Sequence, residues 1–504
     1  MEKLHPIMFA GTGSDVGKSI IAAAFCRIFK QDGYQPAPFK AQNMALNSFA
    51  TPEGLEIGRA QAVQAEAAGV PCHTDMNPLL LKPQSDHTSQ VVLNGRPIGN
   101  RNAYDYFRKE GRDELRWEVC AAYDRLAARY NPVVLEGAGS ISEINLRDTD
   151  LVNLPMALHA GADVILVGDI DRGGVFASVY GSLMLLRPHE RERIKGILIN
   201  KFRGDIRLFE SGITMLEELC GIPVVGVVPY YRDIYIEEED SVALAAKSVR
   251  AEKGKVNIAV ILLRHLSNFT DFNVLERDPR VHLFYTNNVD ELAKADVILL
   301  PGSKSTLDDL YELRRNGVAA IIRAHREGAT VMGICGGYQM MGQEVLDPEH
   351  VEGDIERLPG LGLLPISTRM SGEKVTRQVK FGLCNPHSPS STLHSPLMQG
   401  YEIHMGVTTP VEGTPDSPLN LLENGSTDGY YVDSTCMGTY IHGILDNPEF
   451  IDFLLVPFAD KLSGNAGAFD YHTFKEEQYD RLAEHVRRHV NLPLIYQILT
   501  KNHD

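Results

Sequence analysis

The first half of the chain alternates short apolar runs with longer segments whose apolar residues recur at helical spacing. Each run is mainly apolar and most are rich in β-branched residues, as expected for parallel strands that are buried on both faces. The pattern therefore predicts an α/β doubly wound domain, a parallel sheet wrapped by helices. The expected strands are Ile7–Ala10, Pro132–Leu135, Asp163–Val167, Gly196–Ile199 and Val224–Val228, and the clearest expected helices are Ile20–Lys30 and Glu114–Arg129.

This alternation stops between Pro229 and about Lys255, a stretch that contains the acidic run Glu237–Asp240. We interpret it as a solvated linker. A second series of apolar runs then begins, and the last part of the chain is mostly helical in pattern. The sequence thus predicts a second doubly wound α/β domain, with boundaries at residues 1–235 for the first domain, 236–255 for the linker, 256–450 for the second domain and 451–504 for a C-terminal helical segment. The runs of the second series are Val256–Leu263, Val297–Leu300, Thr330–Ile334 and Gly438–Ile441.

Composition limits the partners that the protein can have. The chain has 504 residues, of which 43% are hydrophobic and 23% charged, as in soluble globular proteins of two or three domains. The formal charge of −17 argues against nucleic acid or an anionic membrane as a main partner, although it leaves room for a small anionic ligand. The sequence shows neither a signal-peptide pattern nor an apolar run of membrane-spanning length, and its seven cysteines form no Cys-x-x-Cys pair. We therefore expect a cytoplasmic protein without structural zinc.

A glycine-rich segment, Gly11-Thr-Gly-Ser-Asp-Val-Gly-Lys-Ser19, follows the first expected strand and opens the first expected helix. Glycines let backbone N–H groups turn toward phosphates, and the helix N-terminus adds partial positive charge. We expect Lys18 to reach the outer phosphates of ATP and Ser19 to bind Mg²⁺. The common form of this loop has one residue fewer between its glycines, and the longer form resembles that of the dethiobiotin synthetase group of ATP-dependent enzymes. The expected ATP-binding residues of the loop are Thr12, Gly13, Ser14, Asp15, Val16, Gly17, Lys18 and Ser19.

Polar residues at other strand ends support a nucleotide site. Glu136 ends a buried run, where a carboxylate can meet Mg²⁺, and its Leu-Glu-Gly-Ala-Gly segment is similar to one in the dethiobiotin synthetase group. The same resemblance implies that Asn200 recognises the adenine edge and that Lys40 stabilises phosphate and an acyl phosphate. That group also has an aspartate on an early helix as a metal ligand. In this region the chain offers Arg59 or Gln61 instead.

The segment Val331-Met-Gly-Ile-Cys-Gly-Gly-Tyr-Gln339 is an apolar run that ends in a cysteine between glycines. A strand-to-helix turn of this kind lifts a nucleophile out of a sheet. A histidine in Gly438-Thr-Tyr-Ile-His-Gly443 can serve as its base. We predict that Cys335 and His442 form the catalytic pair of an acyl-transfer site. His404 is a second candidate, either for a domain-interface or substrate role or as a structural histidine.

These segments resemble the nucleophile turn of class I glutamine amidotransferases. The resemblance implies that Gln339 binds glutamine and that the N–H groups of Gly302, in Pro-Gly-Ser, and Gly336 stabilise the tetrahedral oxygen. Most members of that class orient the histidine with a glutamate two residues later, where this chain has Ile444. Either another group orients His442 or the site works as a dyad, and a dyad should hydrolyse glutamine more slowly.

Nearly the whole chain resembles the cobyric acid synthase family, glutamine-dependent amidases of cobalamin biosynthesis. The resemblance implies a phosphate-loop, dethiobiotin synthetase-like domain followed by a class I glutamine amidotransferase-like domain. It also implies ATP-dependent amidation of the b, d, e and g carboxylates of adenosyl-cobyrinic acid a,c-diamide, with ATP and Mg²⁺ as cofactors and glutamine as the nitrogen source. The segments that carry it are Gly11–Ser19, Lys40-Ala-Gln-Asn-Met-Ala-Leu-Asn-Ser48, Met76-Asn-Pro-Leu-Leu-Leu-Lys82, Ser267-Asn-Phe-Thr-Asp-Phe272, Leu300-Pro-Gly-Ser-Lys-Ser305 and Gly400-Tyr-Glu-Ile-His404.

Two alternatives stay open at the level of sequence. The first is the same class of enzyme with another substrate, as in cobyrinic acid a,c-diamide synthesis. The second is a partitioning-type ATPase switch fused to a degenerate amidotransferase-like sensor, which an intact pair of Cys335 and His442 argues against. In each case the expected partners are small molecules, with neither nucleic acid nor membrane, and a homo-oligomer is left open.

Overall fold

The computed structural model describes residues 3–83, 88–102, 112–237, 247–384, 397–462 and 469–500. The chain forms two compact units that depart from linear order in two places. The first unit comprises Met1–Ala45, Glu56–Glu237 and Thr473–Asp504, and the second comprises Leu46–Leu55 and Glu238–His472. A short segment of the N-terminal half thus belongs to the second unit, and the last helices belong to the first. The domain boundaries expected from the sequence, which run in linear order, include neither of these two segment assignments.

The first unit is built on a parallel sheet with the strand order β12-β11-β10-β1-β9-β2. Its central strands are buried along their whole length because helices cover both faces, which explains the continuous apolar runs in the sequence. The strands are β1 (Ile7–Gly11), β2 (Ala37–Phe39), β9 (Val133–Glu136), β10 (Asp163–Asp169), β11 (Ile194–Phe202) and β12 (Val224–Pro229). Each expected strand of this half lies within or overlaps one of them.

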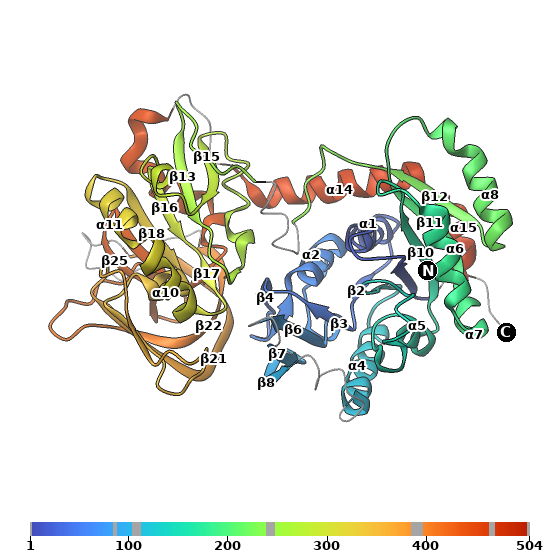
Figure 1. Cartoon of the computed structure of the whole chain (residues 1–504), viewed down its shortest axis with the longest axis horizontal. Helices are drawn as coiled ribbons and strands as arrows, with labels where there is room; N and C mark the ends of the chain where they lie inside the picture. Colours follow the sequence, from blue (N-terminus) through green and yellow to red (C-terminus); the bar gives the residue numbers. More distant parts are fainter. Residues whose placement is uncertain are drawn as a thin grey trace. The chain divides into compact units, whose positions relative to one another are not determined.

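The helices of the first unit come from both ends of the chain. The C-terminal helix α15 (Leu492–Thr500) contacts the edge strand β12, and α14 (Tyr471–His489) precedes it (Figure 1). Ion pairs from Arg27 to Glu476 and Asp480 join α14 to α1. The remaining helices are α1 (Lys18–Gln31), α2 (Arg59–Ala68), α4 (Arg112–Ala127), α5 (Leu154–Ala160), α6 (Val175–Leu185), α7 (Pro188–Arg191) and α8 (Glu210–Cys220).

A smaller four-stranded sheet lies between β2 and α4 in the sequence. Its order is β3-β6-β7-β8, with β3 parallel to β6 and the other pairs antiparallel. The strands are β3 (Gln42–Met44), β6 (Leu79–Pro83), β7 (Thr88–Leu93) and β8 (Arg96–Asn102), and the short strand β5 (Glu56–Gly58) leads into α2.

The second unit has its own mainly parallel sheet, ordered β15-β13-β16-β18-β26-β25 with an antiparallel edge strand β25. Its strands are β13 (Val256–Ile261), β15 (Val281–Thr286), β16 (Val297–Leu300), β18 (Thr330–Ile334), β25 (Tyr430–Asp433) and β26 (Cys436–Thr439). The main helices are α9 (Val289–Leu292), α10 (Thr306–Asn316), α11 (Val318–Arg326), α12 (Gly336–Met340) and α13 (Pro448–Leu455). The two doubly wound sheets agree with the α/β fold class expected from the sequence.

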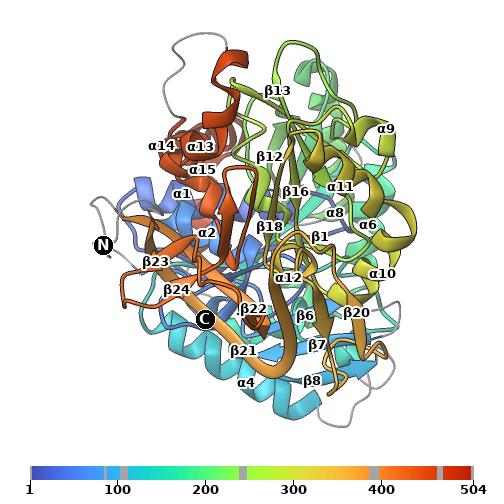
Figure 2. The same ribbon diagram turned by 90° about the vertical axis from the view of Figure 1, so that its left-hand side faces the viewer.

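A large, mainly antiparallel sheet in the second unit was not expected from the sequence. Its order is β20-β19-β21-β22-β27, with β23 and β24 beside it, and Figure 2 shows the long strands β21 and β22 side by side in orange. These strands alternate buried with exposed positions and lack a continuous apolar run, so their composition gives a weak signal. The strands are β19 (Glu344–Leu346), β20 (Arg357–Pro359), β21 (Ile366–Leu383), β22 (Met398–Pro410), β23 (Asn420–Leu422), β24 (Thr427–Asp428) and β27 (Ile441–His442).

Three short elements complete the second unit: β4 (Ser48–Ala50), β14 (Leu266–Ser267) and β17 (Gly302–Ser303), of which the last two pair with each other. Within the described ranges, the structure contains no helix that is both long and apolar enough to cross a membrane.

Candidate active site

The glycine-rich loop of the first unit runs from the end of β1 into α1. Gly17 has a φ of 96°, and a Cβ there would lie 2.2 Å from Nδ2 of Asn200, so this position requires glycine. The Asn200 amide donates to the carbonyl of Val16 at 2.9 Å. The Lys18 ammonium donates to the carbonyls of Gly13 and Gly139, both at 2.9 Å. The loop is therefore held in a fixed curve by residues that are distant in sequence.

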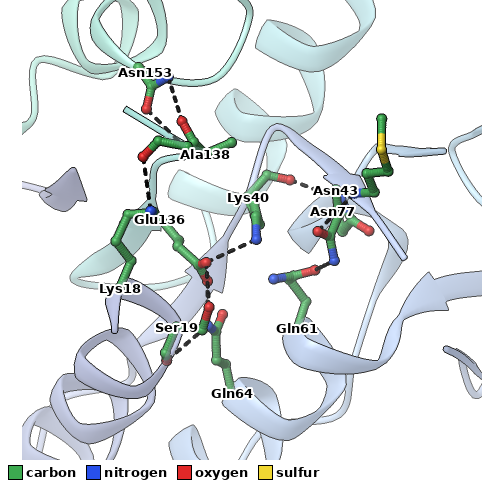
Figure 3. A network of polar contacts seen from close by, with 12 residues as sticks. Lys18, Ser19, Lys40, Asn43, Gln61, Gln64, Asn77, Glu136, Ala138 and Asn153 are labelled. Atoms are coloured by element: carbon green, nitrogen blue, oxygen red, sulfur yellow. Dashed lines mark hydrogen bonds and ion pairs between the residues drawn. The ribbon is translucent and has the colours of Figure 1, made fainter. Parts of the chain in front are cut away.

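Glu136 is the centre of a buried polar cluster beside this loop (Figure 3). Its carboxylate accepts hydrogen bonds from the Ser19 hydroxyl at 2.7 Å, from the Lys40 ammonium at 2.9 Å and from the Gln64 amide at 2.7 Å. The Glu136 side chain is only 1% exposed. Burial alone would raise the pKa of Glu136, but the charge of Lys40 and the three hydrogen bonds hold it below its usual value. The carboxylate is therefore ionised and ready to meet a cation.

The chemistry of this cluster fits Mg²⁺. A hard divalent cation prefers carboxylate and hydroxyl oxygens, and Ser19 and Glu136 present one of each, 2.7 Å apart at the start of α1. The predicted ligands thus lie together, although they belong to segments more than a hundred residues apart.

The two residues offered in place of the missing aspartate have other partners. Arg59 pairs with Glu237, and Gln61 accepts a hydrogen bond from Asn43 at 3.0 Å. Gln64, one turn further along α2, donates to Glu136 and also to the Ser19 carbonyl at 3.3 Å. Helical spacing could have found it, since residues three apart share a face.

A cavity of about 230 Å³ in the first unit is lined mainly by the segment that follows β9. Its lining includes Gln42, Arg112, Gly139 and Asn153. Because the carbonyl of Gly139 accepts a hydrogen bond from Lys18, the cavity borders the place where the outer phosphates of a nucleotide are expected.

Cys335 in the second unit ends β18 and stands directly before α12. Its φ of 53° and ψ of −112° are strained for a non-glycine residue, a conformation typical of nucleophile turns. The neighbouring glycines are required sterically: a Cβ on Gly337 would lie 2.0 Å from the carbonyl oxygen of Leu300, and one on Gly336 would lie 2.9 Å from the backbone nitrogen of Ser303. The turn is therefore packed against the loop Gly302–Ser303, as the oxyanion prediction requires.

His442 on β27 is positioned by Asp271, a residue that the sequence analysis did not single out. The Nδ1 atom of His442 lies 2.7 Å from Oδ2 of Asp271, and the N–H of Gly443 donates to Oδ1 of the same carboxylate at 3.0 Å. Both side chains are buried, at 1% and 3% exposure. The orienting group is thus an aspartate from far upstream in the sequence, while Ile444 is buried and apolar.

Burial lowers the pKa of His442, but the charges of Asp271 and Cys335 and hydrogen bonds with both groups raise it to about 10. His442 is therefore an imidazolium at neutral pH. The ring of His442 is hydrogen-bonded to Cys335, as a base paired with a nucleophile must be.

Gln339 projects from α12 into the same region. Its carbonyl oxygen accepts from Thr306 at 3.2 Å, and its amide donates to the carbonyl of Met405 at 2.8 Å and to the hydroxyl of Tyr440 at 3.2 Å. Gly302 also belongs to this region, because a Cβ there would lie 3.3 Å from the His442 ring.

His404 lies near His442 in the second unit. Its ring stacks on that of Tyr440 with a centroid distance of 3.7 Å, and burial lowers its pKa to about 3. A neutral, stacked imidazole fits the structural reading of this residue better than an acid–base role. Asp271 itself lies in the Ser267–Phe272 segment, which carried the family resemblance but had been given no role.

Comparisons with known proteins agree with both centres. Residues 7–242 match the CobQ/CobB/MinD/ParA nucleotide binding domain, and residues 257–450 match the CobB/CobQ-like glutamine amidotransferase domain. The chain thus joins a nucleotide-binding domain to a glutamine amidotransferase domain, and its curated relatives show that it is an amidating ligase.

Full-length relatives are more specific. The chain is 81% identical over 502 residues to the cobyric acid synthase of Bacteroides fragilis and 74% identical over 502 residues to that of Phocaeicola vulgatus, with 99% of each chain covered in both comparisons. The enzyme of Citrobacter koseri is 47% identical, again with 99% of each chain covered. The chain belongs to the cobyric acid synthase family, and hence to cobalamin biosynthesis.

Proposed function

We propose that this enzyme amidates the b, d, e and g carboxylates of adenosyl-cobyrinic acid a,c-diamide, using ATP and glutamine, to give adenosyl-cobyric acid. The observation that carries the proposal is that one chain holds a buried carboxylate centre beside a phosphate loop and a separate buried Cys-His-Asp centre. A carboxylate is a poor acyl electrophile until activated, so the two centres supply the two things that amidation needs: an activated carboxylate and ammonia.

The second unit supplies ammonia. The Cys335 thiolate attacks the side-chain amide carbon of glutamine, and the N–H groups of Gly302 and Gly336 stabilise the negative oxygen. The His442 imidazolium donates a proton to the leaving nitrogen, and ammonia departs from a glutamyl thioester. His442 then takes a proton from a water molecule that attacks the thioester. Glutamate leaves, and the thiolate and the imidazolium are restored.

The first unit activates the acceptor. Lys18 and Lys40 place positive charge where the outer phosphate of ATP passes to a carboxylate oxygen, which yields an acyl phosphate and ADP. Ammonia attacks the acyl carbon, the C–O bond to phosphate breaks, and the amide and inorganic phosphate result. Mg²⁺, which Ser19 and Glu136 would hold, supplies neutralisation of phosphate charge. The cavity that borders Gly139 would receive the carboxylate arm of the acceptor.

Product analysis tests this function directly. The protein is incubated with ATP, Mg²⁺, adenosyl-cobyrinic acid a,c-diamide and glutamine labelled in its side-chain amide nitrogen. We expect four labelled amides to enter the corrinoid, with ATP hydrolysed in step, as followed by mass spectrometry. If the diamide is left unchanged while an unamidated corrinoid gains amides at a and c, the enzyme has the alternative substrate. ATP hydrolysis with no amidation of either corrinoid would contradict the proposal.

A further inference from the structure

A ten-residue segment, Leu46–Leu55, belongs to the second unit although the residues on both sides of it belong to the first. We call it the arm. It is anchored along β21: the carbonyl of Ala50 accepts a hydrogen bond from Gln378 at 3.0 Å, and Gly54 approaches so closely that a Cβ there would lie 2.9 Å from the carbonyl oxygen of Thr376. Ser48 and Ala50 are fully buried. The arm is therefore a packed part of the glutaminase unit.

One side of the arm holds the aromatic ring that covers the catalytic histidine. Tyr401 is the register partner of His442 in the pairing of β22 with β27, and the two rings stack with centroids 5.3 Å apart. The arm contacts Tyr401 twice: Phe49 packs on its ring at 4.5 Å, and the carbonyl of Ser48 accepts a hydrogen bond from its hydroxyl at 3.3 Å. These contacts fix the orientation of the Tyr401 ring, on which the imidazole of His442 stacks.

The other side of the arm holds the turn that carries Asp271. The backbone N–H of Ser48 donates to Oδ1 of Asn268 at 3.0 Å. Asn268 adopts left-handed angles (φ 53°, ψ 40°) directly before the short helix Phe269–Phe272, and its carbonyl accepts from the N–H of Asp271 at 3.0 Å. One residue of the arm thus touches both supports of His442, its stacking partner and the turn of its carboxylate.

We propose that the arm is a positioning element of the glutaminase centre, which holds Tyr401 and the Asn268–Asp271 turn in place and so fixes the orientation of the His442 ring. Orientation matters here because His442 must first give a proton to the leaving ammonia and then take one from water, and both transfers require alignment of the same nitrogen. The inference rests on the proposed function of the Cys335 centre. It also explains why a segment bounded by strands of the nucleotide unit is built into the glutaminase unit.

The test uses the full-length enzyme and measures steady-state glutamate release. The variants are Phe49→Ala, which removes the ring on Tyr401, and Asn268→Gly, which keeps the left-handed backbone but removes the acceptor for Ser48. Asn268→Asp is the matched control, since it keeps an oxygen at that place. Tyr401→Phe is the mildest variant, because it removes one hydroxyl and keeps the stacking on His442. Ammonia-dependent amidation is measured in parallel as a report on the first unit.

We expect Phe49→Ala and Asn268→Gly to lower kcat for glutamate release about tenfold or more, with KM for glutamine changed less than about threefold. Asn268→Asp should recover most of the lost kcat. The kcat of Tyr401→Phe should lie between that of the parent and those of Phe49→Ala and Asn268→Gly. Ammonia-dependent amidation should stay within about twofold of the parent in all four variants.

Unchanged kcat in both Phe49→Ala and Asn268→Gly would overturn the positioning role, as would equal losses in Asn268→Gly and Asn268→Asp. If either main variant does not fold, Tyr401→Phe decides the question, and a kcat equal to that of the parent counts against the arm. Failure of the proposed function would look different, since the parent itself would then release no glutamate or accept no ammonia.

Discussion

The two catalytic centres of this chain are built in different ways. The nucleotide centre is organised around one continuous loop, to which strand ends add single residues such as Glu136 and Lys40. The glutaminase centre is assembled from separate pieces, because Asp271, Cys335 and His442 stand on three distant segments and the arm comes from the other half of the chain. A phosphate is bound largely by backbone groups and needs a loop of defined curvature. Proton transfer between side chains needs several residues at fixed angles, which local sequence cannot supply.

The electrostatics of the two centres also differ. In the nucleotide centre, Lys40 keeps the buried Glu136 ionised. In the glutaminase centre, Asp271 keeps the buried His442 protonated next to a thiol. The Glu136 cluster presents a negative charge to a positively charged ligand. In the glutaminase centre both charges, those of Asp271 and His442, belong to the protein. Substitutions should therefore separate the two activities, and they are taken here from the largest expected effect to the smallest.

Cys335→Ala should abolish glutamine-dependent amidation, by about 10⁴-fold or more, because it removes the nucleophile itself. Ammonia-dependent amidation should remain close to that of the parent, since carboxylate activation lies in the other unit. Both reactions are followed as amide formation on the corrinoid. A folded variant that loses both would show that the centres are not separable.

Lys18→Ala should stop amidation with either nitrogen source, with a loss of about 10³-fold, because the variant no longer neutralises charge on the transferring phosphate. The measurement is ADP formation with glutamine and with ammonium salts. Near-normal turnover with ammonia would remove the phosphate-loop assignment.

Asp271→Asn should lower kcat for glutamate release about 10²-fold while leaving ammonia-dependent amidation intact, since it changes the orientation and the proton affinity of His442. The charge of Asp271 raises the pKa of His442, so the alkaline limit of the glutaminase pH profile should move to lower pH in the variant. An unshifted profile would mean that another group controls this proton.

The same pair predicts a pH dependence of stability. The pKa of His442 is raised from 6.5 to about 10 in the folded protein, so its protonation stabilises the fold fully below pH 6.5, and this contribution is lost as the pH rises toward about 10. Thermal unfolding of the parent and of Asp271→Asn across this window checks the sign. The parent should lose more stability than the variant as the pH increases, and parallel curves would contradict the pairing.

Gln64→Ala should have the smallest effect, a loss of about tenfold in amidation with either nitrogen source. It removes one hydrogen bond to Glu136 and leaves Ser19 and Lys40 in place. Gln61→Ala is the matched control on the same helix, since Gln61 accepts a hydrogen bond from Asn43. Equal losses of amidation activity in the two variants would show that the hydrogen bond from Gln64 to Glu136 does not matter for the reaction.

Much of this could be read from the sequence alone. The apolar runs predicted both parallel sheets, because strands buried on two faces must be apolar along their length. The glycine loop and the Gly-Ile-Cys-Gly-Gly turn were visible because their chemistry is local: backbone approach and positive φ demand glycine at neighbouring positions, as Gly17 and Gly337 show.

Only the tertiary structure decided the rest. Asp271 looks like any aspartate in a short helical turn until the fold brings it to 2.7 Å from His442, and Gln64 is an ordinary helical glutamine until α2 faces Glu136. The place of Leu46–Leu55 in the second unit, and of α14 and α15 in the first, has no local signature, because it depends on contacts between residues hundreds of positions apart. Short-range sequence patterns predict the secondary structure of each segment. Pairing between segments is settled by the packing of the whole chain, where a buried charge must meet its partner.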